Sequence, residues 1–156
     1  MQLALSARLG MLALASLALG AGDANDLRAP TRVHVVALDY ALQALDSVPA
    51  GMTEFEFDNR GAREHELLIG LLRPGMGAAE IMAAHQKGLN FRQVPGVYLE
   101  GAMSGMLFAA PRTRSPATLA LPLTAGRDYI LLCQLRDSVG ATPHALLGMF
   151  RVIHVR

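Results

Sequence analysis

Three side chains near the end of the sequence are of types that together bind a soft transition metal. They are Cys133, His144 and Met149, separated by ten and by four residues. A thiolate, two imidazole nitrogens and a weak thioether form the ligand set of blue-copper electron-transfer sites, where sulfur favours Cu(I) and imidazole accepts Cu(II). The spacing therefore predicts a site for one copper ion, provided that a second histidine reaches it.

His65 is the best placed of the remaining histidines. It follows a turn at residues 59–61 and begins the apolar run 66–72, so a loop at one end of a sheet could carry it to the other three side chains. The other histidines are expected to point to solvent, two in alternating strands and one on a helix. They are His34, His154 and His85.

Taken singly, two of these residues have ordinary structural explanations. A lone Cys133 is more often a buried, inert thiol, since free cysteine is among the most buried residue types. Met149 alone would be a core side chain near the last strand. Their shared spacing with His144 favours the metal site, in which the ligand role of Met149 depends wholly on its companions.

The pattern of short apolar runs and turns predicts the elements that must position these residues. The predicted strands are 32–40, 42–48, 52–57, 66–72, 117–123, 128–135 and 146–155, with one helix at 77–88 and mostly loop over 91–114. About seven short strands with a helix inserted in a connection indicate an all-β fold. We predict an antiparallel Greek-key β-sandwich as a single domain over residues 32–156.

The N-terminal segment and the composition limit where the protein works. Residues 1–24 have a short basic start, an apolar run and small residues, as in a secretory signal peptide, and residues 25–31 form a linker. We therefore expect a periplasmic or secreted protein with no stable membrane insertion after cleavage. The single cysteine excludes an internal disulfide, and scattered charges that sum to +1 give no indication of nucleic acid binding.

These motifs resemble the cupredoxins, the family that includes plastocyanin, azurin and the copper domains of larger oxidases. The most specific part is the strand 129–133 ending in Cys133, followed by the pairs Pro143–His144 and Gly148–Met149. Residues 49–61, which lead to His65, are similar to the stretch that delivers the family's first histidine ligand. Across about residues 32–156, the resemblance implies that His65, Cys133, His144 and Met149 hold one copper ion, cycling between Cu(I) and Cu(II).

Two features depart from the family's pattern. The loop from Cys133 to His144 is longer than in plastocyanin. Glu66 also stands where plastocyanin and azurin usually place an asparagine that braces the ligand loops, so a carboxylate there could lower the reduction potential or bind a second ion. Asn59 is a candidate for the brace instead.

The resemblance implies outer-sphere electron transfer rather than enzymatic catalysis. The expected partners are exported redox or copper-handling proteins that dock transiently near an exposed edge of His144, through an apolar patch at residues 145–147. Two other functions stay open: a periplasmic copper carrier or chaperone, and a metal-free cupredoxin-like interaction module in which Cys133 is structural.

Overall fold

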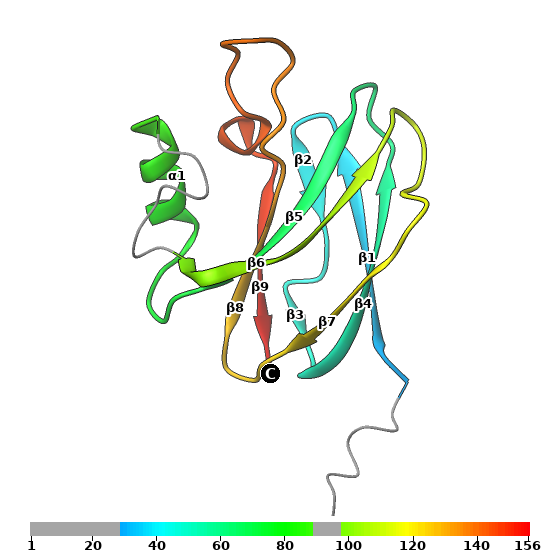
Figure 1. Ribbon diagram of the computed structural model, residues 1–156, viewed down its shortest axis with the longest axis vertical. Helices are drawn as coiled ribbons and strands as arrows, with labels where there is room; N and C mark the ends of the chain where they lie inside the picture. Colours follow the sequence, from blue (N-terminus) through cyan, green and yellow to red (C-terminus); the bar gives the residue numbers. More distant parts are fainter. Residues whose placement is uncertain (1–28, 89–97) are drawn as a thin grey trace, which may run out of the picture.

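The computed structural model describes residues 29–88 and 98–156 (Figure 1). The predicted signal peptide at 1–24 and all but the last three residues of the linker at 25–31 lie outside the described residues. Among the described helices, none is both long and apolar enough to cross a membrane.

Two sheets pack face to face (Figure 1). The first contains, in spatial order, β2 (Ala41–Gln43), β1 (Thr31–Leu38), β4 (Gly51–Asn59) and β7 (Leu119–Leu123). The second contains β3 (Ser47–Val48), β9 (Phe150–Val155), β8 (Asp128–Leu132), β5 (His65–Leu72) and β6 (Tyr98–Ala109). Spatial neighbours are mostly not consecutive along the chain, so the connections cross from one sheet to the other.

The predicted β-sandwich is confirmed, with one refinement of strand direction. Most neighbouring strands are antiparallel, but β1 pairs in parallel with β4, and β3 pairs in parallel with β9. Both sheets are therefore mixed. The predicted strand 42–48 is divided into β2 and β3, which belong to opposite sheets. The strand is interrupted because the chain leaves β1 in the first sheet before it pairs with β9 in the second.

Alternation along the strands builds the core between the sheets. In β8, Tyr129 and Leu131 face this inner core, while Ile130 and Leu132 face a second apolar cluster on the outer side of the sheet. β5 is divided in the same way. A strand that is buried on both faces reads as a continuous apolar run, which explains why residues 66–72 show no polar face.

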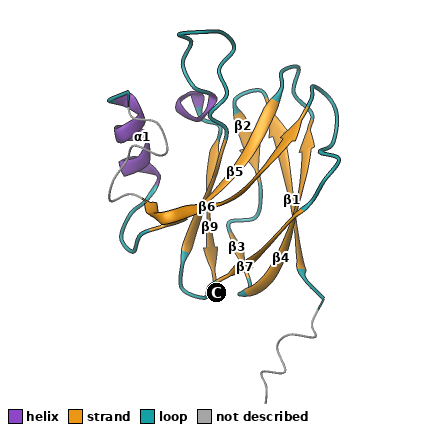
Figure 2. Ribbon diagram, viewed as in Figure 1, coloured by secondary structure: helices purple, strands orange, loops and turns teal. Residues whose placement is uncertain are grey.

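The helix α1 (Ala78–Gln86) covers the outer side of the second sheet (Figure 2). Its Ile81 and Ala84 are buried against Leu68 and Leu72 of β5, and Ala145 belongs to the same outer cluster. The predicted helix is confirmed. It packs on the sheet and contacts the short 3₁₀ helix η3 (His144–Leu147). Residues 146 and 147 of η3 were predicted to begin the last strand, which starts only at Phe150.

The predicted loop at 91–114 is wrong over residues 98–109, because β6 runs from Tyr98 to Ala109 along β5. Residues 91–97 of that prediction lie outside the described residues. Glycines in β6 obscured the strand pattern. At Gly105 the side chain of Leu119 occupies the space that a Cβ atom would take, so a larger residue would force Leu119 to shift. The glycine therefore marks a close approach between strands rather than a break in structure.

Candidate metal centre

The predicted ligands come together at one end of the sandwich. His65 is the first residue of β5, Cys133 directly follows β8, and His144 begins η3. η3 and the loop 134–143 form the upper end of the molecule as drawn in Figure 1. Residues 68 apart in the sequence thus become neighbours because β5 and β8 are adjacent antiparallel strands.

Strand alternation aims the first two side chains inward. In β5, Leu67 and Ile69 belong to the inner core, and His65 continues their face by period two. In β8, Tyr129 and Leu131 face inward, and Cys133 continues that face in the same way. Both functional side chains therefore extend a row of core residues up to the end of the sandwich.

Three donor atoms meet there. The Nδ1 atoms of His65 and His144 lie 3.2 Å apart, and Cys133 Sγ lies 3.9 Å and 3.5 Å from them, respectively. All three residues are at most 1% exposed. Bonds of about 2.0–2.3 Å from imidazole nitrogen and thiolate sulfur to one ion place the donors roughly 3–4 Å apart. The three atoms have the spacing that one metal ion requires.

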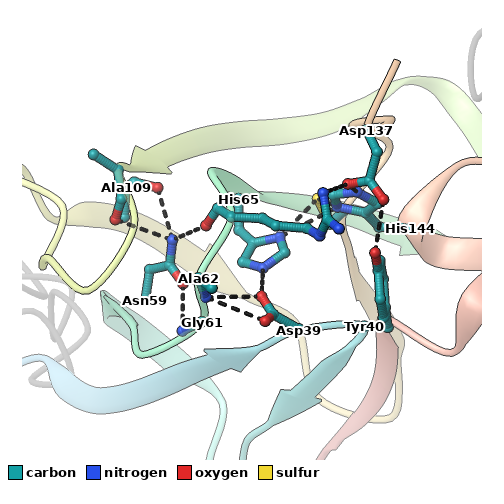
Figure 3. Close-up of polar contacts among 12 residues, drawn as sticks. Asp39, Tyr40, Asn59, Gly61, Ala62, His65, Ala109, Asp137 and His144 are labelled. Atoms are coloured by element: carbon teal, nitrogen blue, oxygen red, sulfur yellow. Dashed lines mark hydrogen bonds and ion pairs between the residues drawn. The ribbon is translucent and has the colours of Figure 1, made fainter. Parts of the chain in front are cut away.

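The outer nitrogens of the two rings show which atoms are free to bind it (Figure 3). Nε2 of His65 lies 3.3 Å from Oδ1 of Asp39, and Nε2 of His144 lies 3.0 Å from Oδ1 of Asp137. An ionised carboxylate can only accept, so each neutral ring carries its proton on Nε2. Both Nδ1 lone pairs then face each other and the sulfur. Lone pairs that converge on one point in this way suit a bound cation.

Hydrogen bonds keep both carboxylates ionised. Burial alone would raise the pKa of Asp39, but hydrogen bonds from Ala62 N–H and His65 outweigh it, and the pKa lies below its usual value. The pKa of Asp137 is lowered chiefly by the hydrogen bond from the Tyr40 hydroxyl. Both aspartates are therefore ionised at neutral pH and can accept a hydrogen bond from the imidazole that each one faces.

Cys133 is held ready as a ligand but is not an acidic thiol. Burial raises its pKa to about 11, although backbone N–H groups of Glu66 and Leu135 donate to the sulfur and oppose that shift. The thiolate is therefore not stabilised by the protein alone. Because thiolate rather than thiol binds metals, a bound metal has to supply that stabilisation.

Two side chains brace the loops around the donors. Asn59 is fully buried and donates through Nδ2 to the carbonyls of Arg63, Ala109 and Ala110, while its Oδ1 accepts from Gly61 N–H (Figure 3). It thereby ties the segment before His65 to the end of β6. Asn59 therefore braces the loop that leads to His65, whereas these hydrogen bonds do not include a residue of the loop from Cys133 to His144.

Glu66 forms a second brace. Its Oε1 accepts a hydrogen bond of 2.9 Å from the backbone N–H of Gln134, which links the residue after His65 to the residue after Cys133. Burial raises the pKa of Glu66, and this hydrogen bond opposes the shift. The carboxylate therefore connects the two ligand strands, and among the described residues the cluster of three metal-binding side chains contains His65, Cys133 and His144 but not Glu66.

Met149 lies in the inner core beside the cluster. It is fully buried, and its backbone is paired on both sides, because its carbonyl accepts from Cys133 N–H and its N–H donates to the His144 carbonyl. These two backbone hydrogen bonds hold Met149 next to Cys133 and His144. Its role as the axial ligand stays a prediction.

The exposed edge expected for His144 is absent. His144 is 1% exposed, because Asp137 and the ring of Tyr40 cover it, the ring lying edge-on with centroids 5.3 Å apart. Of the expected apolar patch, Ala145 is buried and Leu147 is 46% exposed. The predicted exposed edge of His144 is therefore wrong, because Asp137 of the long loop after Cys133 and Tyr40 cover the imidazole. Docking of a partner at residues 145–147 stays a prediction.

The covering residues were not singled out by sequence reasoning. Asp39 and Tyr40 form the two-residue turn between β1 and β2, and Asp137 lies in the loop between Cys133 and His144. The length of that loop was the available signal, because extra residues beside a ligand need something to contact. The remaining histidine predictions hold for His34 and His154, whose side chains are 40% and 56% exposed, while the side chain of His85 lies outside the described residues.

Comparison with known proteins gives the fold a name. No family model matches the sequence, and no curated protein matches it. Among solved structures, auracyanin from the photosynthetic bacterium Roseiflexus castenholzii superimposes with a TM-score of 0.53 at 17% identity, covering 83% of this chain and 99% of that one. Auracyanin B gives 0.53 at 19% identity, covering 83% and 91%.

Auracyanin A, a "blue" copper protein from the green thermophilic photosynthetic bacterium Chloroflexus aurantiacus, gives a TM-score of 0.51 at 17% identity, covering 82% of this chain and 100% of that one. Likeness at this identity concerns the arrangement of strands. The chain therefore has the cupredoxin fold.

Proposed function

We propose that this protein binds one copper ion through His65, Cys133, His144 and Met149 and carries single electrons between exported redox proteins. The observation that supports it most strongly is the buried meeting of two Nδ1 atoms and one sulfur within 3.2–3.9 Å of one another. A bound copper ion would supply a centre that gains and loses one electron reversibly, between Cu(II) and Cu(I). One structural neighbour, auracyanin A, is a blue copper protein, which agrees with this choice of metal.

The chain's own part is to hold the ligands still. His65 and Cys133 extend strands of the core, and the backbone bonds of Met149 tie it to Cys133 and His144. Outer contacts that fix the rings, such as those of Asp39 and Asp137, restrict rotation about the ligand side chains. A ligand set that cannot rearrange suits both oxidation states, which favours rapid transfer of one electron.

The closed surroundings favour electron transfer over metal delivery. All three clustered ligands are buried, so an ion leaving the site would require the loop around Asp137 to open. An electron needs no such opening. Transient redox partners are therefore proposed to dock over the residues that cover His144.

A titration of the protein from residue 25 onward with Cu(II) tests the proposal. The expected result is an intense visible thiolate-to-copper absorption band that saturates at one equivalent, and a matching paramagnetic resonance signal. Cys133→Ser should abolish the band, and Met149→Leu should change its position and the reduction potential. Met106→Leu is the matched control, because Met106 is 44% exposed on β6.

The other outcomes separate the alternative functions. Tight binding of Cu(I) without a reversible redox cycle would indicate a copper carrier. A weak spectrum that is indifferent to Cys133→Ser, with no tight binding of either oxidation state, would indicate a metal-free interaction module.

Export to the periplasm or the medium is proposed from residues 1–24. Expression of the full chain in a bacterium, followed by fractionation and mass spectrometry of the N-terminus, tests it. A mature form that begins near residue 25 outside the cytoplasm is the expected result. A full-length chain retained in the cytoplasm would contradict the proposal.

A further inference from the structure

Both metal-facing rings have the same kind of partner behind them, although the partners come from different loops (Figure 3). Asp39, in the turn between β1 and β2, stands behind His65, and Asp137, in the loop after Cys133, stands behind His144. Each imidazole therefore has one carboxylate behind it, which fixes the ring and the nitrogen that carries its proton. A carboxylate that accepts from a ligand histidine also makes its other nitrogen a stronger donor.

The carboxylates are themselves held in place. Asp39 accepts from Ala62 N–H through both oxygens, at 3.0 and 3.2 Å. Asp137 accepts a 2.6 Å hydrogen bond from the Tyr40 hydroxyl and pairs with the Arg63 guanidinium at 2.9 Å. Neither aspartate is free to rotate away from its imidazole.

Tyr40 occupies its position in a costly backbone conformation. Its φ is +64°, in the left-handed region that non-glycine residues rarely adopt, at a cost of about 1 kcal/mol or more. In this conformation the ring lies edge-on to His144 while the hydroxyl reaches Asp137. Backbone strain of this kind persists only where surrounding contacts impose it.

We propose that Asp39 and Asp137 are positioning residues that set the reduction potential of the copper site, by strengthening both imidazole donors and so favouring Cu(II) over Cu(I). This inference rests on the proposed function. A stronger nitrogen donor and a nearby negative charge each stabilise the more highly charged ion to a greater extent. The paired aspartates therefore hold the potential lower than the same four ligands would give alone.

The Tyr40 hydroxyl acts in the opposite direction. It donates to the oxygen of Asp137 that does not face His144, and so withdraws negative charge from the carboxylate. Removing the hydroxyl leaves Asp137 a stronger acceptor for the imidazole proton. A change at Tyr40 should then lower the potential, whereas a change at Asp137 should raise it.

The test uses isosteric variants of the full mature chain. Asp39→Asn and Asp137→Asn remove the charge and keep the shape, and Tyr40→Phe keeps the ring over His144. Asp128→Asn is the matched control, because Asp128 lies 2.8 Å from Nδ1 of His154, a histidine outside the donor cluster. The measurements are the midpoint potential and the separate affinities for Cu(II) and Cu(I).

We expect Asp39→Asn and Asp137→Asn each to weaken Cu(II) binding about 10–100-fold, with a smaller effect on Cu(I). Each tenfold change in the ratio of the two affinities raises the potential by about 59 mV. Tyr40→Phe should lower the potential, and Asp128→Asn should leave it unchanged. If both aspartate variants match Asp128→Asn, or if Tyr40→Phe and Asp137→Asn shift the potential in the same direction, the inference is overturned.

A measurement without copper separates this inference from the proposed function. The ¹⁵N shifts of the histidine rings in the metal-free protein report which nitrogen carries the proton, and we expect Nε2 in both His65 and His144. A ring with its only proton on Nδ1 overturns the inference even if copper binds. Absence of copper binding by the unaltered protein, with Nε2 protonated, refutes the proposed function instead.

Discussion

The hairpin of β8 and β9 carries a carboxylate–histidine pair at each end. At the end near the C-terminus, Oδ1 of Asp128 lies 2.8 Å from Nδ1 of His154, and the two side chains are 46% and 56% exposed. At the other end, Oδ1 of Asp137 lies 3.0 Å from Nε2 of His144, whose side chain is 2% exposed. The residue types and the separations are nearly the same.

The second ring nitrogen makes the difference between the two pairs. In the buried pair, Nδ1 of His144 faces His65 and Cys133, and water is excluded. In the exposed pair the carboxylate contacts Nδ1 of His154, so the second nitrogen is Nε2, and among the described residues His154 belongs to no cluster of metal-binding side chains. A carboxylate–histidine pair can therefore tune a metal only where the fold supplies further donors to the remaining nitrogen.

The largest expected effect is on copper binding when each histidine is removed in turn. His144→Ala should weaken binding by more than about 100-fold and abolish the visible band, because a direct ligand matters more than its outer partner. His154→Ala should leave both unchanged. Competition with a chelator of known affinity measures the difference, and equal losses in the two variants would contradict the comparison.

Asn59 tests whether the buried end depends on its hydrogen bonds as well as its shape. Asn59→Asp keeps the volume but replaces the donor to three carbonyl groups with an acceptor. Each unsatisfied buried group costs about 1–3 kcal/mol, so we expect a loss of about 3 kcal/mol or more in the free energy of unfolding. Denaturant unfolding of the metal-free protein measures it, and a loss below about 1 kcal/mol would show that Asn59 is not a brace.

Gly61 tests how closely the loops pack behind His65. A Cβ atom there would collide with Oδ1 of Asp39 and lie 3.0 Å from Nε2 of His65. Gly61→Ala should destabilise the protein by about 1–3 kcal/mol and raise the reduction potential as Asp39→Asn does. Gly77→Ala is the control, because its nearest contact is an ordinary 3.4 Å to Glu80. An unchanged potential in Gly61→Ala would mean that Asp39 can move without consequence.

The smallest expected effect lies at the exposed end of the hairpin. Asp128→Asn removes one partner of a surface pair, and such pairs typically contribute about 0–1 kcal/mol. The unfolding free energy should change by no more than about 0.5 kcal/mol. Thermal or denaturant unfolding measures it, and a loss above about 1 kcal/mol would remove the contrast drawn between the two ends.

Much of the strand framework could be predicted because local patterns encode it. The alternation that directs Tyr129, Leu131 and Cys133 to one face is visible in the sequence, and so is the apolar run that becomes β5. The strand β6 was missed because glycines such as Gly101 and Gly105 interrupt its pattern, and the packing of Leu119 at Gly105 becomes visible only in the folded structure. The short 3₁₀ helix at His144 was missed because four residues contain too little periodicity to be distinguished from a strand.

The types of the proposed metal ligands can be read from the sequence alone, since Cys133, His144 and Met149 are close along one stretch of chain and no other cysteine is present. What surrounds them depends on the folded arrangement. Asp39 and Asp137 are separated by nearly a hundred residues, and neither has a sequence pattern that marks it as functional. Their positions follow from the turn between β1 and β2 meeting the long loop after β8, and contacts between distant loops depend on how two sheets stack, which no local pattern records.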